Sequence, residues 1–372
     1  MPSANGSSCR SCHSTLVTTL IDFGPQPPSD LFPLTDDPGP DPSWPLALGQ
    51  CRRCFLLQLV GRDVPVPEVP LAVESETSKR HAKESAHLIV SDLSLPRGAT
   101  FAEFDSAHGG SWAFAMQDLG MHLQPAGPVD VVVDVQGLIH DSDLDDALAT
   151  RVARMGQAGH LVIEFHHGLE LVRHQQFDAI RHGHPVYLTL TALQPALARH
   201  GLHMQRARPS DVYGGSLILT AGREDNADSS IAAILTAEAE AGLSDPDRLR
   251  HLDDALWTSA RALHTWLSDR AASGRRTLGY GAPSKAPVLL NLARVGPELL
   301  EFTVDLSEAK QGHRMPITRI PIRSPQELVD ADPDDVLIFT WDIAEEVRGY
   351  LRDLGIGDVE YFTPLPVPTR LP

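Results

Sequence analysis

The feature that most limits the possible fold is a run of β-branched residues, VDVVVDV, at 129–135. A strand that is apolar on both faces is typical of a parallel sheet covered by helices on each side. A second run, HLVIEF at 160–165, follows after a helical pattern at 144–155. Strands that alternate with helices in this way predict parallel sheets with right-handed crossovers, which is an α/β fold.

This alternation occurs in two stretches of the chain, which define the expected domains. A proline-rich N-terminal segment, 1–70, precedes the first alternating stretch, 71–224. An Ala/Leu-rich helical segment, 225–272, separates it from the second, 273–372. We therefore expect a small N-terminal module, a first α/β domain, a helical bridge and a C-terminal domain, with both larger domains Rossmann-like and three-layered.

All four cysteines lie in the N-terminal module, as two Cys-x-x-Cys pairs. Four thiolates at these spacings suit tetrahedral zinc, and a site with four protein ligands leaves no open position for catalysis. A redox dithiol or four unrelated thiols are the alternatives, but two symmetric pairs favour a closed structural site. The sequence thus predicts a zinc-ribbon-like module whose structural zinc is bound by Cys9, Cys12, Cys51 and Cys54.

Charge and hydropathy exclude several classes of partner. With 31 Lys and Arg against 49 Asp and Glu, the chain has a formal charge of −18. Such a chain repels phosphate backbones, so nucleic acid is not expected to bind. No apolar stretch approaches the roughly 20 residues of a transmembrane helix, and the N-terminus lacks an apolar signal core. We expect a cytoplasmic protein that binds no membrane.

Two glycine-containing turns follow predicted strands, which is where α/β domains bind nucleotides and phosphates. In the first, FAEFDSAHGG at 101–110, Asp105 stands where a glycine is expected, and the segment 121–127 offers no acid for a ribose. An ordinary turn explains it equally well. The second, GYGAPSK at 279–285, ends in a lysine at the start of a helix. It predicts a diphosphate site, with a simple capping loop as the alternative.

Histidines follow the predicted strands of the first α/β domain. His140 comes soon after 129–135, His166 directly after 160–165, and His184 lies further along. Since loops at the carboxyl ends of parallel strands converge, these side chains could share one cleft. Histidine accepts a proton near neutral pH, so they are candidate bases, although each one alone is as well explained by a structural role.

Several collinear segments carry a resemblance that spans nearly the whole chain. Besides the cysteine pairs, they are FDAIRHGHPVYLTLTAL (177–193), YGGSL (213–217), GYGAPSK (279–285), LLNLARVGPELLEFTVDLSEAKQG (289–312) and TWDIAEE (340–346). With these segments the chain resembles the sugar C-methyltransferases that act on nucleotide-linked 4-keto deoxysugars. The resemblance implies a zinc-binding domain, a methyltransferase domain and a C-terminal Rossmann-like domain.

In that family a histidine removes the proton next to a ketone, and the carbanion attacks the methyl group of S-adenosylmethionine. The resemblance gives the role of base to His184, with His182 in the same motif and His140 nearby. Arg181 replaces a family tyrosine and could hold an enolate oxygen. The expected contacts to a nucleotide-diphosphate sugar are Tyr187, Tyr213, Gly279, Tyr280, Gly281 and Lys285.

Departures from the family concentrate on the methyl-donor side. The family's EIGSNDG turn is Glu103–Gly109 here, without its first glycine and its Asn-Asp pair, and we expect the strand with the ribose-binding acid to be missing. Losing both features would weaken binding of the cofactor by a factor of roughly 100 or more. If S-adenosylmethionine binds, its expected contacts are Glu103, Gly109, Glu164 and His166.

Three functions therefore compete. The favoured one is proton abstraction next to a carbonyl of a nucleotide-linked ketosugar or related metabolite without S-adenosylmethionine, as in an epimerase, isomerase or lyase. The alternative is an active S-adenosylmethionine-dependent sugar C-methyltransferase of natural-product biosynthesis. A catalytically degenerate binding protein comes third, because His184 and the 279–285 turn are kept.

Overall fold

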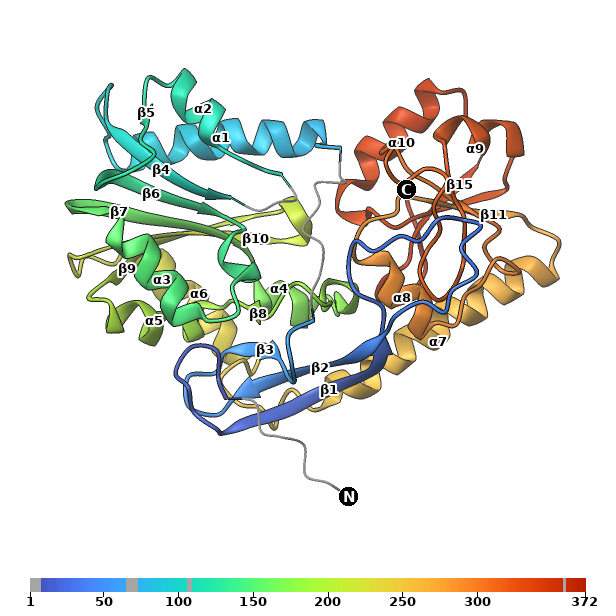
Figure 1. Ribbon diagram of the computed structural model, residues 1–372, viewed down its shortest axis with the longest axis horizontal. Coiled ribbons are helices and arrows are strands. Elements are labelled where there is room, and N and C mark those ends of the chain that lie inside the picture. Colours follow the sequence, from blue (N-terminus) through green and yellow to red (C-terminus); the bar gives the residue numbers. More distant parts are fainter. Residues whose placement is uncertain (1–7, 65–72, 106–108, 357–358) are drawn as a thin grey trace.

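The structure, a computed structural model, describes residues 8–64, 73–105, 109–356 and 359–372. Two α/β domains lie side by side, with the N-terminal strands along the base of the first (Figure 1). The predicted combination of a four-cysteine module with two Rossmann-like sheets is confirmed.

The N-terminal module is an antiparallel sheet that contacts both larger domains. Its strands are β1 (Val17–Gln26), β2 (Trp44–Cys51) and β3 (Leu57–Leu59). A fourth strand, β8 (Val186–Tyr187), comes from the first α/β domain and pairs with β3. The loop between β1 and β2 reaches the C-terminal domain, where Asp41 Oδ2 lies 2.6 Å from Arg314 Nη1 in a buried ion pair.

The first α/β domain is built on a six-stranded sheet with the order β5-β4-β6-β7-β10-β9. Its strands are β4 (Thr100–Asp105), β5 (His122–Leu123), β6 (Val129–Val135), β7 (Met155–His166), β9 (His203–Ser210) and β10 (Ser216–Gly222). The first four in this order are parallel, whereas β10 is antiparallel to both of its neighbours. The expectation that the strand beside β4 is missing was wrong, because β5 keeps its place with two residues.

Helices cover both faces of this sheet, as the valine run of β6 requires. Val131 and Val133 pack with α1 (Glu76–Asp92) and α2 (Ala113–Asp118) in one core. Val132 packs in a second core on the opposite face, with α3 (Leu144–Ala153) and α5 (Leu190–Arg199). The short α4 (Gly168–Arg173) follows β7. Each valine thus removes apolar surface from water, at about 1.5–3 kcal/mol per fully buried side chain.

Two helices connect the α/β domains. The helix α6 (Ser229–Glu240) begins at Asp228, whose side chain accepts a hydrogen bond from the Ser230 amide. It is followed by the 22-residue helix α7 (His251–Ala272), which packs against β1, α8 and β11. The 225–272 segment therefore consists of helices, as its composition predicts.

The C-terminal domain contains a sheet with the order β13-β12-β11-β14-β15-β16. All pairs are parallel except β15 with β16. The strands are β11 (Thr277–Tyr280), β12 (Thr303–Val304), β13 (Ile322–Arg323), β14 (Asp335–Ile338), β15 (Glu360–Thr363) and β16 (Thr369–Arg370). The helices are α8 (Ala286–Leu292), α9 (Pro325–Ala331) and α10 (Ala344–Asp353).

Specific polar contacts join the two α/β domains. Trp341 Nε1 donates to Asp178 Oδ2 at 2.8 Å. The Glu346 carboxylate of α10 accepts hydrogen bonds from the Glu76 and Thr77 amides at 3.0 and 2.9 Å, and so caps the start of α1. Gly214 packs so closely on Trp341 that an added Cβ would lie 2.5 Å from the indole ring.

Among the helices within the described ranges, none combines the length and the apolar character that crossing a membrane would need.

Candidate functional site

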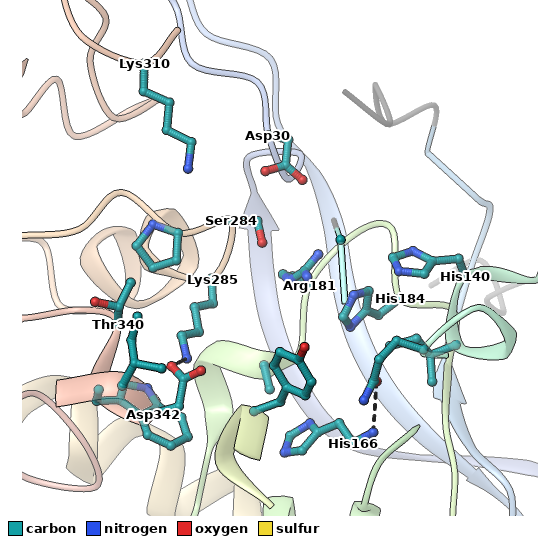
Figure 2. Close-up of a pocket in the computed structure, with 18 residues that line it drawn as sticks. Asp30, His140, His166, Arg181, His184, Ser284, Lys285, Lys310, Thr340 and Asp342 are labelled. Atoms are coloured by element: carbon teal, nitrogen blue, oxygen red, sulfur yellow. Dashed lines mark hydrogen bonds and ion pairs between the residues drawn. The ribbon is translucent and has the colours of Figure 1, made fainter. Parts of the chain in front are cut away.

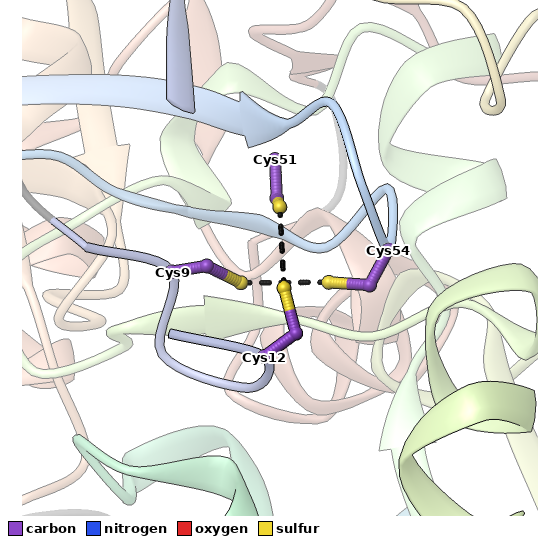
Figure 3. A group of neighbouring side chains, drawn as sticks. All are labelled: Cys9, Cys12, Cys51 and Cys54. Atoms are coloured by element: carbon purple, nitrogen blue, oxygen red, sulfur yellow. Dashed lines mark hydrogen bonds between the residues drawn. The ribbon is translucent and has the colours of Figure 1, made fainter. Parts of the chain in front are cut away.

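The four cysteines converge on one point of the N-terminal module (Figure 3). Their sulfur atoms all lie within 4.8 Å of one another, with 3.4 Å between Cys9 and Cys54 and 3.6 Å between Cys12 and Cys51. Tetrahedral zinc with Zn–S bonds of about 2.3 Å separates its sulfur ligands by roughly 3.8 Å. The geometry therefore fits the predicted structural zinc.

Both cysteine pairs sit in turns of the same construction. The His13 amide donates to the Cys9 carbonyl and the Phe55 amide to the Cys51 carbonyl, and both residues after the pairs have a left-handed φ, 56° and 61°. Amides also point at the sulfurs, with Ser11 N 3.4 Å from Cys9 Sγ and Arg53 N 3.3 Å from Cys51 Sγ. These donors stabilise thiolates, the form that binds zinc.

A cavity of about 270 Å³ lies between the two α/β domains. Figure 2 shows side chains from the first α/β domain on one side and from the C-terminal domain on the other, with Asp30 of the N-terminal module between them. His140 lies in the segment that follows β6, and His166 is the last residue of β7, so both stand at the carboxyl edge of the parallel strands.

His140 and His184 line this cavity together. Their ring centroids are 4.7 Å apart and their planes meet at 88°. His140 Nδ1 lies 3.0 Å from the Gly183 carbonyl, which can only accept, so Nδ1 carries the proton and Nε2 is the basic nitrogen. The structure thus brings together two of the histidines that the sequence predicts as catalytic.

His182 and Tyr187 are not among the described residues that line the cavity. His182 Nε2 donates to the Trp44 carbonyl at 3.3 Å, and the Tyr187 hydroxyl accepts from the Arg181 amide at 3.1 Å. Both residues are buried, Tyr187 within β8 itself. The catalytic role of His182 and the substrate contact of Tyr187 stay predictions, and in this structure both side chains support the turn that carries His184.

The second glycine turn contributes one charged side chain to the cavity, Lys285. Its Nζ lies 2.6 Å from Asp342 Oδ1 and 4.0 Å from the centre of the Trp341 ring. Burial acts to raise the pKa of Asp342, but the nearby charge of Lys285 outweighs this effect and holds that pKa below its usual value. Lys285 is therefore neutralised within the protein, and its contact with a diphosphate stays a prediction.

The glycines and the tyrosine of this turn serve packing. A Cβ on Gly279 would lie 2.7 Å from Thr303 Oγ1, and Tyr280 is a buried residue of β11. Gly281 has a left-handed φ of +92°, and its amide donates a hydrogen bond to the Val304 carbonyl. None of the three is among the described residues at the cavity, so the structure does not support their substrate contacts, which stay predictions.

Tyr213 and His166 do line the cavity. A Cβ at residue 110 would lie 2.8 Å from the Tyr213 hydroxyl, so only glycine fits there. Burial raises the pKa of Tyr213 to about 12 and lowers the pKa of His166 to about 4. His166 Nε2 donates to Gln176 Oε1 at 2.7 Å. Both groups are therefore neutral near pH 7.

The methyl-donor side lies at the carboxyl end of β4, where the cavity reaches Gly109. Gly109 has a φ of +93°, and an added Cβ would meet none of the described atoms within 4 Å. Close by, Glu74 Oε1 accepts a hydrogen bond from the Gly110 amide at 3.3 Å. A glycine backbone beside a carboxylate suits the cationic amino-acid half of S-adenosylmethionine.

The segment after β5, where the ribose of S-adenosylmethionine would bind, is arranged differently from the turn at Gly109. β5 is followed by Gln124, whose Nε2 donates to the carbonyls of Ala126 and Pro128. Glu103 accepts from the Trp112 amide at 2.6 Å and from Ser111 Oγ at 2.5 Å, and so holds the start of α2. Consequently β5 offers no carboxylate for the ribose hydroxyls, as the sequence predicts.

Glu164, a predicted cofactor contact, is fully buried in β7 and contacts His81 Nε2. Neither it nor Glu103 is among the described residues that line the cavity. Their direct contact with S-adenosylmethionine is therefore not supported, whereas Gly109 and His166 are in place for it.

The sequence analysis did not single out several polar or aromatic residues of the cavity, among them Asp30, Gln136, Lys310, Trp341 and Asp342. The last three belong to segments that carry the family resemblance, which was a usable signal. Asp30 lies in a proline-rich loop that gives none.

The comparisons with known proteins agree with this arrangement. Residues 9–62 match the model of a putative zinc-binding domain, and residues 211–366 match that of a C-methyltransferase C-terminal domain. The chain is 26% identical to the C-methyltransferase NovU of Streptomyces niveus over 403 aligned positions, which cover 97% of this chain and 96% of NovU.

Solved structures resemble only part of the chain. A magnesium protoporphyrin IX methyltransferase of Synechocystis PCC 6803 is 14% identical with a TM-score of 0.31, covering 41% of this chain and 90% of its own. The PH0226 protein of Pyrococcus horikoshii OT3 is 9% identical with a TM-score of 0.31, covering 42% and 95%. The chain thus matches a putative zinc-binding domain followed by a C-methyltransferase C-terminal domain, and it is similar over nearly its whole length to a C-methyltransferase.

Proposed function

We propose that the protein is an S-adenosylmethionine-dependent C-methyltransferase that methylates a carbon next to a carbonyl of a small molecule. The observation that carries this proposal is the pair of rings of His140 and His184, 4.7 Å apart at a cavity between the α/β domains. Sequence departures favoured chemistry without a methyl donor, but full-length similarity to a C-methyltransferase favours the alternative.

In the proposed reaction, His184 removes the acidic proton and the negative charge moves to the carbonyl oxygen. The buried guanidinium of Arg181 stabilises that oxygen as it becomes an enolate. His140 holds a fixed tautomer and contacts the ring of His184, which orients it. S-adenosylmethionine, when bound, supplies an electrophilic methyl group. Gly109 and Glu74, which the Gly110 amide holds in place, would contact its amino-acid half.

A nucleotide-linked ketosugar is the proposed substrate class. Of the cations at the cavity, Lys285 is paired with Asp342, whereas Arg181 makes no ion pair within the described residues, so Arg181 is the cation that an anionic nucleotide sugar would meet. The resemblance to the ketosugar-methylating family points to the same class.

The first test measures exchange of the C–H next to the ketone. A thymidine-diphosphate 4-keto-6-deoxysugar is incubated with the protein in D₂O, with and without S-adenosylmethionine, and followed by NMR and mass spectrometry. We expect deuterium incorporation, and a product heavier by one methyl group when the cofactor is present. His184→Gln should slow exchange by about 10²–10⁴-fold. His174→Gln, at an exposed histidine, is the matched control. Equal rates for both variants would contradict the proposal.

A second candidate, proton transfer without a methyl donor, is favoured by one observation: β5 provides no carboxylate for the ribose. Calorimetry separates the two. Binding of S-adenosylmethionine at micromolar concentration would reject the second candidate, whereas exchange or epimerisation with no measurable cofactor binding would reject the first.

A further inference from the structure

Arg181 is a buried cation that faces the cavity. Only 8% of the residue is exposed, and its side chain lies beside His184 and Asp30 in Figure 2. A guanidinium offers five N–H donors. Across the described ranges, its hydrogen-bond partner is Ser29 Oγ at 3.5 Å, the outer limit for such a bond. The protein thus leaves most of this donor capacity for a ligand.

Two carboxyl groups lie close enough to Arg181 to act on its charge. Asp30 and Asp178 act on it through space, and burial raises the pKa of both carboxyl groups. Asp178 is already hydrogen-bonded to Trp341. Lys310, a second cation at the cavity, donates to the Ala282 carbonyl at 2.9 Å and lies 3.7 Å from Asp305. None of these carboxyl groups makes a hydrogen bond to Arg181 within the described residues, so its unused N–H donors are where an anion would bind.

This anion would bind close to the reacting carbon rather than at a remote diphosphate. Arg181 and His184 belong to one tight turn, in which the His184 amide lies 3.3 Å from the Arg181 carbonyl, and both side chains line the cavity. The planar fork of a guanidinium matches a carboxylate in bidentate geometry, which an ammonium cannot do.

We propose that Arg181 binds a carboxylate that the substrate carries next to its reacting carbon, so that acidic, uronate-type ketosugars bind more tightly than neutral ones. This inference rests on the proposed function and names its substrate class. Arg181 then has two roles. It binds the carboxylate of the substrate before the reaction, and it stabilises the enolate oxygen during the reaction.

The test compares two stable ligands, UDP-glucuronate and UDP-glucose, which differ in whether C6 is a carboxylate or a hydroxymethyl group. Calorimetry on the full-length zinc protein measures both dissociation constants. We expect UDP-glucuronate to bind roughly 10- to 100-fold more tightly. Arg181→Tyr, which restores the family residue, and Arg181→Met should remove this preference. Arg173→Met, at an exposed arginine, should keep it.

Asp30 provides a second, independent variant. Because it is the acid that competes for Arg181, Asp30→Asn should tighten binding of UDP-glucuronate several-fold and leave UDP-glucose unchanged. Equal binding of both ligands to the wild-type protein, or a preference that survives in Arg181→Met, would overturn the proposal. These are binding measurements, so they remain decisive even if no ketosugar exchanges its proton. A preference without exchange would leave the carboxylate site standing and reject the proposed function.

Discussion

The zinc site and the cavity are built in opposite ways. Two short turns supply the four zinc ligands, and each turn positions its own pair through backbone hydrogen bonds. The cavity needs Asp30 from the N-terminal module, His140 and His184 from the first α/β domain, and Asp342 from the C-terminal domain. One site therefore depends on local geometry and the other on how three parts of the chain pack.

Zinc removal should have the largest effect, and it tests whether the two sites are independent. Structural zinc contributes about 10–16 kcal/mol in small zinc domains. Because β8 completes the N-terminal sheet just after His184, we expect Cys9→Ser or a strong chelator to unfold the module and abolish ligand binding at the cavity. Circular dichroism and calorimetry check this. Intact ligand binding without zinc would show that the cavity does not depend on the module.

Gly214→Ala should disturb the cavity and spare the zinc site. The new Cβ would lie 2.5 Å from Trp341, at a residue with a φ of +82°, so we expect a loss of about 2–4 kcal/mol in unfolding free energy. Gly274→Ala is the matched control, with a φ of +76° and nothing within 4 Å, and should cost only about 1–2 kcal/mol. Equal losses in chemical denaturation would mean that the contact between the domains contributes nothing.

His166 makes the cavity sensitive to acid. Burial lowers its pKa to about 4, whereas an unfolded histidine titrates near 6.5. The unfolded state therefore binds a proton first as the pH falls from about 6.5 to 4, and the native state loses about 2 kcal/mol by pH 4.5. His166→Gln should lose correspondingly less stability between pH 7 and 4.5 in urea titrations. An identical pH dependence in both proteins would show that His166 is not buried in its neutral form.

Glu346→Gln should give the smallest effect. Its carboxylate accepts from two amides at the start of α1, so neutralising it should weaken this cap by about 0.5–1 kcal/mol. Glu345→Gln alters a neighbouring glutamate that pairs on the surface with Arg348, and should change stability by less. Thermal unfolding of both variants checks the order, and a larger loss at Glu345 would contradict it.

The spacing of residues along the sequence was sufficient to predict several structural features of this protein. The two Cys-x-x-Cys pairs predicted the zinc site because each pair binds through its own turn. The valine run at 129–135 predicted a strand buried on both faces, since side chains alternate between the two sides of a sheet. The position of His140 in the cavity is the one expected from the rule that loops at the carboxyl ends of parallel strands converge.

Tertiary packing decided the rest. His182 and His184 stand two residues apart in one motif, yet only His184 reaches the cavity, because β8 joins the N-terminal sheet and buries His182 against Trp44. Lys285 is neutralised by Asp342, 57 positions away, and Asp30 enters the site from a loop with no motif. Sequence spacing specifies the direction of a side chain within its own turn or strand, but contacts between domains depend on surfaces that form only after each domain has folded.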